Sequence, residues 1–100
     1  MQVAKGRVLT ETLGRAFKLR TGEGLLLQPY KRDRSVYVIR RETLFQVVEY
    51  GFRRKEYHVE EAKLGKLLKK VCRNEFPRSN RVWLKLCSVE DMEDVVKQLR

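Results

Sequence analysis

The chain of 100 residues has one histidine, two cysteines and two prolines, and it has no long apolar run. Its longest aliphatic run is Leu25-Leu26-Leu27, far short of the roughly 18 residues that a membrane-spanning helix needs. Residues 1–9 contain no continuous apolar stretch of the kind found in secretory signals. We therefore expect a cytoplasmic protein with no membrane partner.

The few potential metal ligands exclude a structural zinc site. Such a site needs about four ligands, and the chain offers only Cys72, Cys87 and His58, with no Cys-x-x-Cys motif. Gly22-Glu23-Gly24 is too short for a phosphate-binding loop and lacks its Lys-Ser/Thr. We expect no cofactor and no metal. The two cysteines read as apolar thiols, and a disulfide between them stays open.

Positive charge dominates the composition. The chain has 23 Lys and Arg against 13 Asp and Glu, which gives a net charge of +10. Residues 51–87 hold eleven bases and four acids, whereas residues 88–100 hold four acids and two bases. No block of five or six like charges occurs, so the bases belong to folded elements and not to a disordered tail. A folded domain with this balance typically binds a polyanion.

The hydrophobic pattern predicts a single α+β domain over residues 1–100. Apolar residues at helical spacing or in alternation predict eight elements. In chain order they are a helix over 8–20 (a strand near 7–13 stays open), strands over 25–30 and 35–40, a helix over 42–50, a strand over 52–59, a helix over 60–74, a strand over 81–87 and a helix over 89–100. The expected fold is a four-stranded, mostly antiparallel sheet with helices, in the order α-β-β-α-β-α-β-α.

Alternation within the strands predicts which side chains share a face. A four-residue loop after Tyr30 would place Gln28 opposite Tyr37 and make the face with Leu27 and Val36 the core. In 81–87, three apolar residues (Val82, Leu84, Leu86) face one way and three others (Arg81, Trp83, Lys85) face the other.

The last predicted helix has an apolar face that suits packing, formed by Val89, Met92, Val95, Val96 and Leu99.

Aromatic residues interleaved with bases indicate a surface for single-stranded nucleic acid. Such surfaces stack bases on aromatic rings and hold phosphates in basic grooves, without reading sequence. The residues expected to stack bases are Tyr30, Tyr37, Tyr57 and Trp83. The residues expected to meet phosphates are Lys31, Arg32, Arg34, Arg53, Lys55, Arg81 and Lys85. The alternative for Tyr37, Tyr57 and Trp83 is a place in the core beneath helices.

The interleaving of Tyr30, Tyr37, Tyr57 and Trp83 with Arg53, Lys55, Arg81 and Lys85 resembles the archaeal ThermoDBP-related single-stranded DNA-binding proteins. The resemblance spans the whole chain and includes no diagnostic motif. It implies a four-stranded sheet with helices and a strand-binding cleft with an aromatic lining and basic edges. The many charges and few Asn and Gln agree with a thermophile's composition. DNA is favoured over RNA as the ligand.

Two other classes of function stay open. Glu56 and His58 would share a strand face, so a small basic RNase or toxin using them with nearby Arg residues is one alternative. The other is a protein-interaction domain whose apolar sheet face forms a homo-oligomer or binds an acidic partner.

Overall fold

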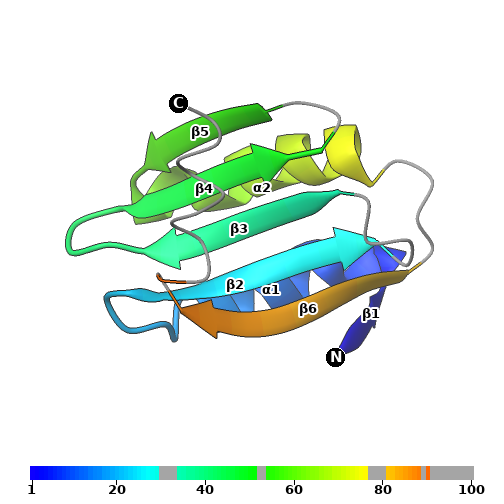
Figure 1. Ribbon diagram of the computed structural model, residues 1–100, viewed down its shortest axis with the longest axis horizontal. Helices are drawn as coiled ribbons and strands as arrows, with labels where there is room; N and C mark the ends of the chain where they lie inside the picture. The colour runs from blue at the N-terminus through cyan, green and yellow to red at the C-terminus, as the bar shows by residue number, and fades with distance from the viewer. Residues whose placement is uncertain (30–33, 52–53, 77–80, 89, 91–100) are drawn as a thin grey trace.

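A six-stranded antiparallel sheet forms one layer of the molecule and two helices form the other (Figure 1). The computed structural model describes residues 1–29, 34–51, 54–76, 81–88 and 90. The strands lie side by side in the order β1-β6-β2-β3-β4-β5. The elements are β1 (Gln2–Ala4), a 3-10 turn (Lys5–Arg7), α1 (Val8–Ala16), β2 (Glu23–Pro29), β3 (Ser35–Arg40), β4 (Phe45–Tyr50), β5 (Arg54–Val59), α2 (Glu61–Glu75) and β6 (Arg81–Ser88).

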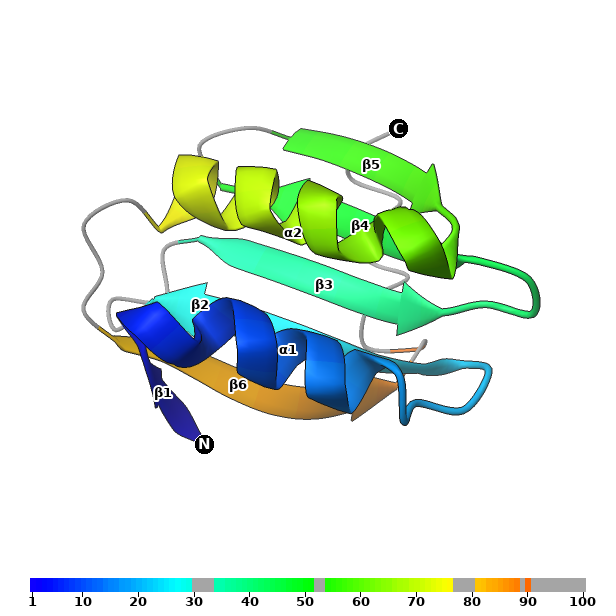
Figure 2. The same cartoon turned by 180° about the vertical axis from the view of Figure 1, so that it is seen from behind.

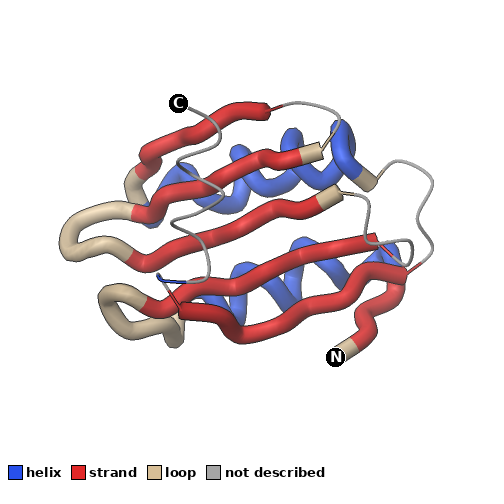
Figure 3. Tube along the Cα trace, in the orientation of Figure 1, coloured by secondary structure: helices blue, strands red, loops and turns tan. Residues whose placement is uncertain are grey.

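The two helices lie on the same face of the sheet, which we call the inner face; the opposite face is the outer face. Seen from the helix side, α1 lies over β2 and β6 and α2 lies over β3 to β5 (Figure 2). The colouring by element type shows the same two layers (Figure 3). None of the helices in the described ranges has the length and apolar content to cross a membrane.

The inner face holds the main core. Leu64, Leu68 and Val71 of α2 are fully buried, at the spacing that places them on one side of a helix. They pack in one cluster with residues of the central strands, among them Leu27, Val36, Val38, Phe45 and Val47. The prediction that the Leu27 and Val36 face forms the core is therefore confirmed, as is the apolar stripe of the 60–74 helix.

The outer face carries a second, smaller apolar cluster. Ile39 and Val48 have no exposed surface, and Tyr37 is 9% exposed; Leu26 and Cys87 pack against them. Strands β3 and β4 are consequently buried on both faces over most of their length.

The predicted helix over 42–50 is wrong, because this segment contains strand β4. Leu44, Phe45 and Val48 fit a helical spacing, but Phe45, Val47 and Glu49 face inward while Gln46 and Val48 face outward. Gln46 and Glu49 are buried, so neither face shows the polar exposure that marks a half-buried strand. The adjacent β-branched pair Val47-Val48 is the signal that favours a strand.

Other predictions are confirmed in outline and corrected in detail. The α+β class and the antiparallel sheet hold, but the sheet has six strands, in the element order β-α-β-β-β-β-α-β. The three-residue strand β1 was missed, and the 8–20 helix ends at Ala16. Tyr37 pairs with Leu26 and not with Gln28, a shift of two residues that keeps every side chain on its expected face. The predicted helix over 89–100 lies outside the described residues apart from Glu90.

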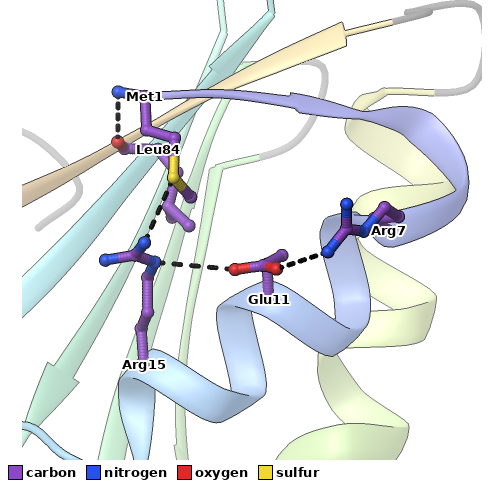
Figure 4. Close-up of polar contacts among 5 residues, drawn as sticks. All are labelled: Met1, Arg7, Glu11, Arg15 and Leu84. Carbon is purple, nitrogen blue, oxygen red and sulfur yellow. Dashed lines mark hydrogen bonds and ion pairs between the residues drawn. The ribbon is translucent and has the colours of Figure 1, made fainter.

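Close to the N-terminus, main-chain and side-chain contacts connect β1, α1 and β6 (Figure 4). The Leu84 amide donates to the Met1 carbonyl at 2.7 Å, and the Met1 ammonium donates to the Leu84 carbonyl at 3.1 Å. On α1, Glu11 lies 3.1 Å from Arg7 and 3.8 Å from Arg15. Arg15 also donates to the Met1 sulfur at 3.1 Å. The two ion pairs of Glu11 are largely exposed, so each adds little to the stability of the fold.

Candidate nucleic-acid interface

One row of side chains crosses the outer face at a single level, and we call it the aromatic row: Trp83, Gln28, Ser35, Tyr50 and Arg54. Trp83 of β6 lies opposite Gln28 of β2, and the Gln28 amide donates to the Ser35 hydroxyl at 3.1 Å. Ser35 lies opposite Tyr50, which lies opposite Arg54. Trp83 and Tyr50 are three strand spacings apart, or about 14 Å.

Trp83 stands at one end of this row between two bases. Strand alternation places Arg81 and Lys85 on its face, as predicted, and both are exposed while Trp83 is half-buried. The Arg81 guanidinium donates to the Gln2 side chain of β1 at 3.2 Å. An indole with cations on both sides is well placed to stack on a base whose phosphates the cations hold.

Tyr50 stands towards the other end, beside Arg54. The Arg54 guanidinium lies over the Tyr50 ring, 5.0 Å from its centroid, and Tyr50 is half-buried. The sequence analysis did not place Tyr50 or Arg54 in the nucleic-acid interface. Tyr50 was assigned to a helix, and Arg53 and Lys55 were chosen in place of Arg54. The signal that was missed is the alternation in Gln46, Val48 and Tyr50, which places the ring on the same face as Trp83.

The topology gathers positive charge at the end of the sheet where this row lies. Strands β2 and β4 end there, and β3, β5 and β6 begin there. The strand ends and the connecting sequences 30–34, 51–53 and 77–80 contain seven bases and one acid, Asp33. The bases are Lys31, Arg32, Arg34, Arg53, Arg54, Arg78 and Arg81. Of these seven, the structure describes Arg34, Arg54 and Arg81, and a group of bases at strand ends favours phosphate binding.

Two carboxylates are buried on the inner side of the same end. Glu49 and Glu75 are 0% and 1% exposed. The Tyr57 hydroxyl donates to Glu49 Oε1 at 3.2 Å, and the Arg34 guanidinium donates to the Glu75 carbonyl at 3.0 Å. Burial, with the Glu49 charge as the second cause, raises the pKa of the Cys72 thiol to about 12. Both acids thus lie on the helix side of the sheet, away from the aromatic row.

Gly51 is required where α2 ends against the turn after β4. A Cβ at this position would overlap a Glu75 carboxylate oxygen and the Arg34 Cβ. The absence of a side chain lets the buried carboxylate approach the backbone.

The Glu56 and His58 pair belongs to a polar network at the other end of the outer face. Arg41 donates to Gln46 Oε1 through Nε and Nη2, at 3.0 and 2.8 Å. This fixes the Gln46 amide so that its Nε2 donates to Glu56 Oε1 at 2.5 Å. His58 Nε2 lies 3.4 Å from the same oxygen. The carboxylate is thus engaged by a neighbouring strand, which suits a structural role better than proton transfer.

No metal centre is formed within the described ranges, where no three His, Cys, Asp or Glu side chains converge. Cys72 lies on α2 at the inner face and Cys87 on β6 at the outer face, and neither forms a disulfide.

The predicted site residues that the structure describes fall into three groups. Trp83, Arg81, Lys85 and Tyr37 share the outer face, although Tyr37 is too buried to stack on a base. Lys55 and Tyr57 lie on the inner face, where Tyr57 packs against the core, which was the alternative for it. Arg34 lies at the basic end. The remaining predicted residues, Tyr30, Lys31, Arg32 and Arg53, lie outside the described residues.

Comparison with known proteins identified no relative of this chain. Scans against protein-family models, curated proteins and solved structures gave no match. The resemblance to ThermoDBP-related proteins therefore stays a prediction from the residues, and the candidate interface depends on its own geometry.

Proposed function

We propose that the protein is a non-enzymatic module that binds single-stranded nucleic acid, DNA in preference to RNA, across the aromatic row. The observation that carries the proposal is the position of two half-buried aromatic rings, Trp83 and Tyr50, on one face at the most basic end of the sheet. Each ring offers a stacking surface that any base fits, worth ~1–3 kcal/mol per base.

The aromatic row and the two bases beside Trp83 contact different parts of the nucleic acid. Trp83 and Tyr50 stack bases, and Arg81, Lys85 and Arg54 contact the phosphates on either side. Gln28, half-buried between the rings, offers an amide to base edges that lie above it. The buried acids Glu49 and Glu75 stay on the inner face and do not meet the strand.

The experiment is a fluorescence titration with short dT and rU oligonucleotides at several salt concentrations. Trp83 is the only tryptophan, so its emission reports on the row directly. Three to five phosphate contacts predict a log affinity that falls with log salt at a slope of roughly −2 to −4. Unchanged Trp83 emission, or affinity that does not respond to salt, would contradict the proposal.

A matched pair of charge variants locates the contact. Arg81→Gln removes a base beside Trp83 and should reduce the magnitude of the salt slope by about 0.7. Lys69→Gln removes an exposed base of α2, on the far side of the sheet, and should leave the slope unchanged. Equal effects of the two variants would mean that binding follows net charge and not the outer face.

A further inference from the structure

The outer face carries an apolar cluster that neither α1 nor α2 covers. We call it the outer-face cluster: Leu26, Tyr37, Ile39, Val48 and Cys87. Ile39 and Val48 have no exposed surface, although α1 and α2 both lie on the opposite face (Figure 2). Neighbours within a sheet shield the flanks of a side chain but leave its outward end open to water. The burial is that of a single chain, so another part of the same chain covers the cluster.

The exposure of the surrounding residues outlines the covered area. Gly24 and Gln46 lie opposite Ile39 on the two neighbouring strands, and both are buried. Lys85 of β6 and His58 of β5 also belong to the outer face, but both are exposed. The covered area therefore extends over β2, β3 and β4 and leaves Lys85 and His58 accessible.

The segment 89–100 starts beside this area and is long enough to cross it. Strand β6 ends at Ser88, next to Cys87, which packs against the cluster. Twelve helical residues are about 18 Å long at 1.5 Å per residue, whereas β6 and β4 are three strand spacings or about 14 Å apart. The other segments outside the described ranges connect elements at the basic end, beyond the aromatic row: 30–33, 52–53 and 77–80.

The chemistry of the segment fits the same role. Its apolar residues recur at the spacing of one side of a helix: Val89, Met92, Val95, Val96 and Leu99. Glu90, the one residue of the segment that the structure describes, is helical and exposed. Residues 88–100 carry two more acids than bases, whereas the whole chain carries a net charge of +10. Opposite charge favours packing of the segment on the rest of the chain.

We propose that residues 89–100 form a helix whose apolar side covers the outer-face cluster and whose acids face the solvent. The sheet then lies between helices on both faces, which accounts for the burial of β3 and β4 on both sides. The helix stops short of the aromatic row, where Trp83 and Tyr50 are half-buried. It therefore bounds the row on one side, and a nucleic acid lies between this acidic helix and the basic end. This last consequence rests on the proposed function.

Disulfide trapping tests the packing without any nucleic acid. In a chain whose two native cysteines are replaced by alanine, Val48→Cys is combined in turn with Val95→Cys, Val96→Cys and Leu99→Cys. At least one pair should form an intramolecular disulfide on mild oxidation, seen as faster migration on a non-reducing denaturing gel. The matched control is Val47→Cys with the same three partners, because Val47 is equally buried but packs in the inner core. Cross-linking of no Val48→Cys pair, or equal cross-linking from Val47→Cys, would overturn the proposal.

Thiol labelling tests it in a chain that keeps both native cysteines. Val96→Lys places a charge against the cluster and should make Cys87 react several times faster, with a smaller change at Cys72 in the inner core. Asp94→Asn changes the net charge by the same amount on the solvent side of the helix and should leave both rates unchanged. A Cys87 rate that equals the wild type, or that rises no more than the Cys72 rate, would overturn the proposal.

Oligonucleotide binding by the cross-linked variant tests the boundary of the row. The oxidised and reduced forms should bind with equal affinity, because the helix lies beside the row and need not move. Weaker binding by the oxidised form alone would show that the strand needs the covered area, which would overturn the boundary. If neither form binds, the proposed function fails while the cross-linking result still decides where the helix packs.

Discussion

The hydroxyl of Tyr57 donates a hydrogen bond to the buried carboxylate of Glu49, 3.2 Å away on the neighbouring strand of the inner face. The aromatic ring that the sequence places among bases thus has its polar group directed inward. Lys55, which precedes it on the same face, is exposed at the edge of the sheet. Tyr57 therefore contributes to stability, and the aromatic row on the outer face does without it.

Replacing Tyr57 by Phe should lower stability and leave oligonucleotide binding unchanged. The variant keeps the ring but removes a donor to a buried carboxylate, and hydrogen bonds to charged groups contribute about 1.5–3 kcal/mol. Urea denaturation measures the loss, and the fluorescence titration measures binding. A variant of wild-type stability that binds more weakly would place Tyr57 in the interface after all.

Two glycine substitutions should change stability in opposite directions. Gly51→Ala places a methyl group against the Glu75 carboxylate and the Arg34 side chain, and overpacking of this kind costs about 1–3 kcal/mol. Gly14→Ala lies within α1 with no atom within 4 Å of the new methyl group, so it should stabilise by roughly 0.5–1 kcal/mol. Thermal unfolding of both variants beside the wild type tests the pair. A neutral Gly51→Ala would mean that the basic end is loosely packed.

The difference between what the sequence predicted and what it missed has a physical reason. The stripe of Leu64, Leu68 and Val71 identified α2, because a helix on one side of a sheet exposes its other side to water. The same reasoning failed for strand β4, because this strand is buried on both faces and places Gln46 and Glu49 among apolar neighbours. No local pattern reveals that a glutamate will be buried beside a tyrosine hydroxyl.

For the candidate site, sequence alternation correctly grouped Trp83 with Arg81 and Lys85 on one strand face. It did not show which strands lie beside each other, and this decides that Trp83 joins Gln28 and Tyr50 in one row. The pairing of β6 with β2 places Trp83 opposite Gln28, 55 positions away in the chain. Non-local pairing of this kind leaves no trace in a window of neighbouring residues.

Alkaline pH should destabilise the fold through Cys72. Burial raises its pKa from the ordinary 9.0 to about 12 in the folded state, so between these pH values the unfolded chain releases a proton that the folded chain keeps. Stability then falls as pH rises, by roughly 1 kcal/mol per pH unit from this group. Cys72→Ala should flatten the fall in denaturation curves measured from pH 9 to 11. An identical slope in wild type and variant would show that the thiol ionises as readily in the fold as outside it.

The two aromatic rings of the row should contribute to binding separately from stability. Trp83→Ala and Tyr50→Ala should each weaken oligonucleotide binding by ~1–3 kcal/mol, because each removes one stacking surface. Leu84→Ala, next to Trp83 but on the inner face and 5% exposed, should instead cost about 2–5 kcal/mol of stability. Fluorescence anisotropy with a labelled oligonucleotide measures binding in all three variants, and thermal unfolding measures stability. Because Trp83 and Tyr50 are about 14 Å apart, their losses should add in the double variant. If Trp83→Ala unfolds the domain as Leu84→Ala is expected to, the indole is a core residue and the outer face does not bind the strand. If only one of the two rings affects binding, the strand follows the edge near that ring and does not cross the row.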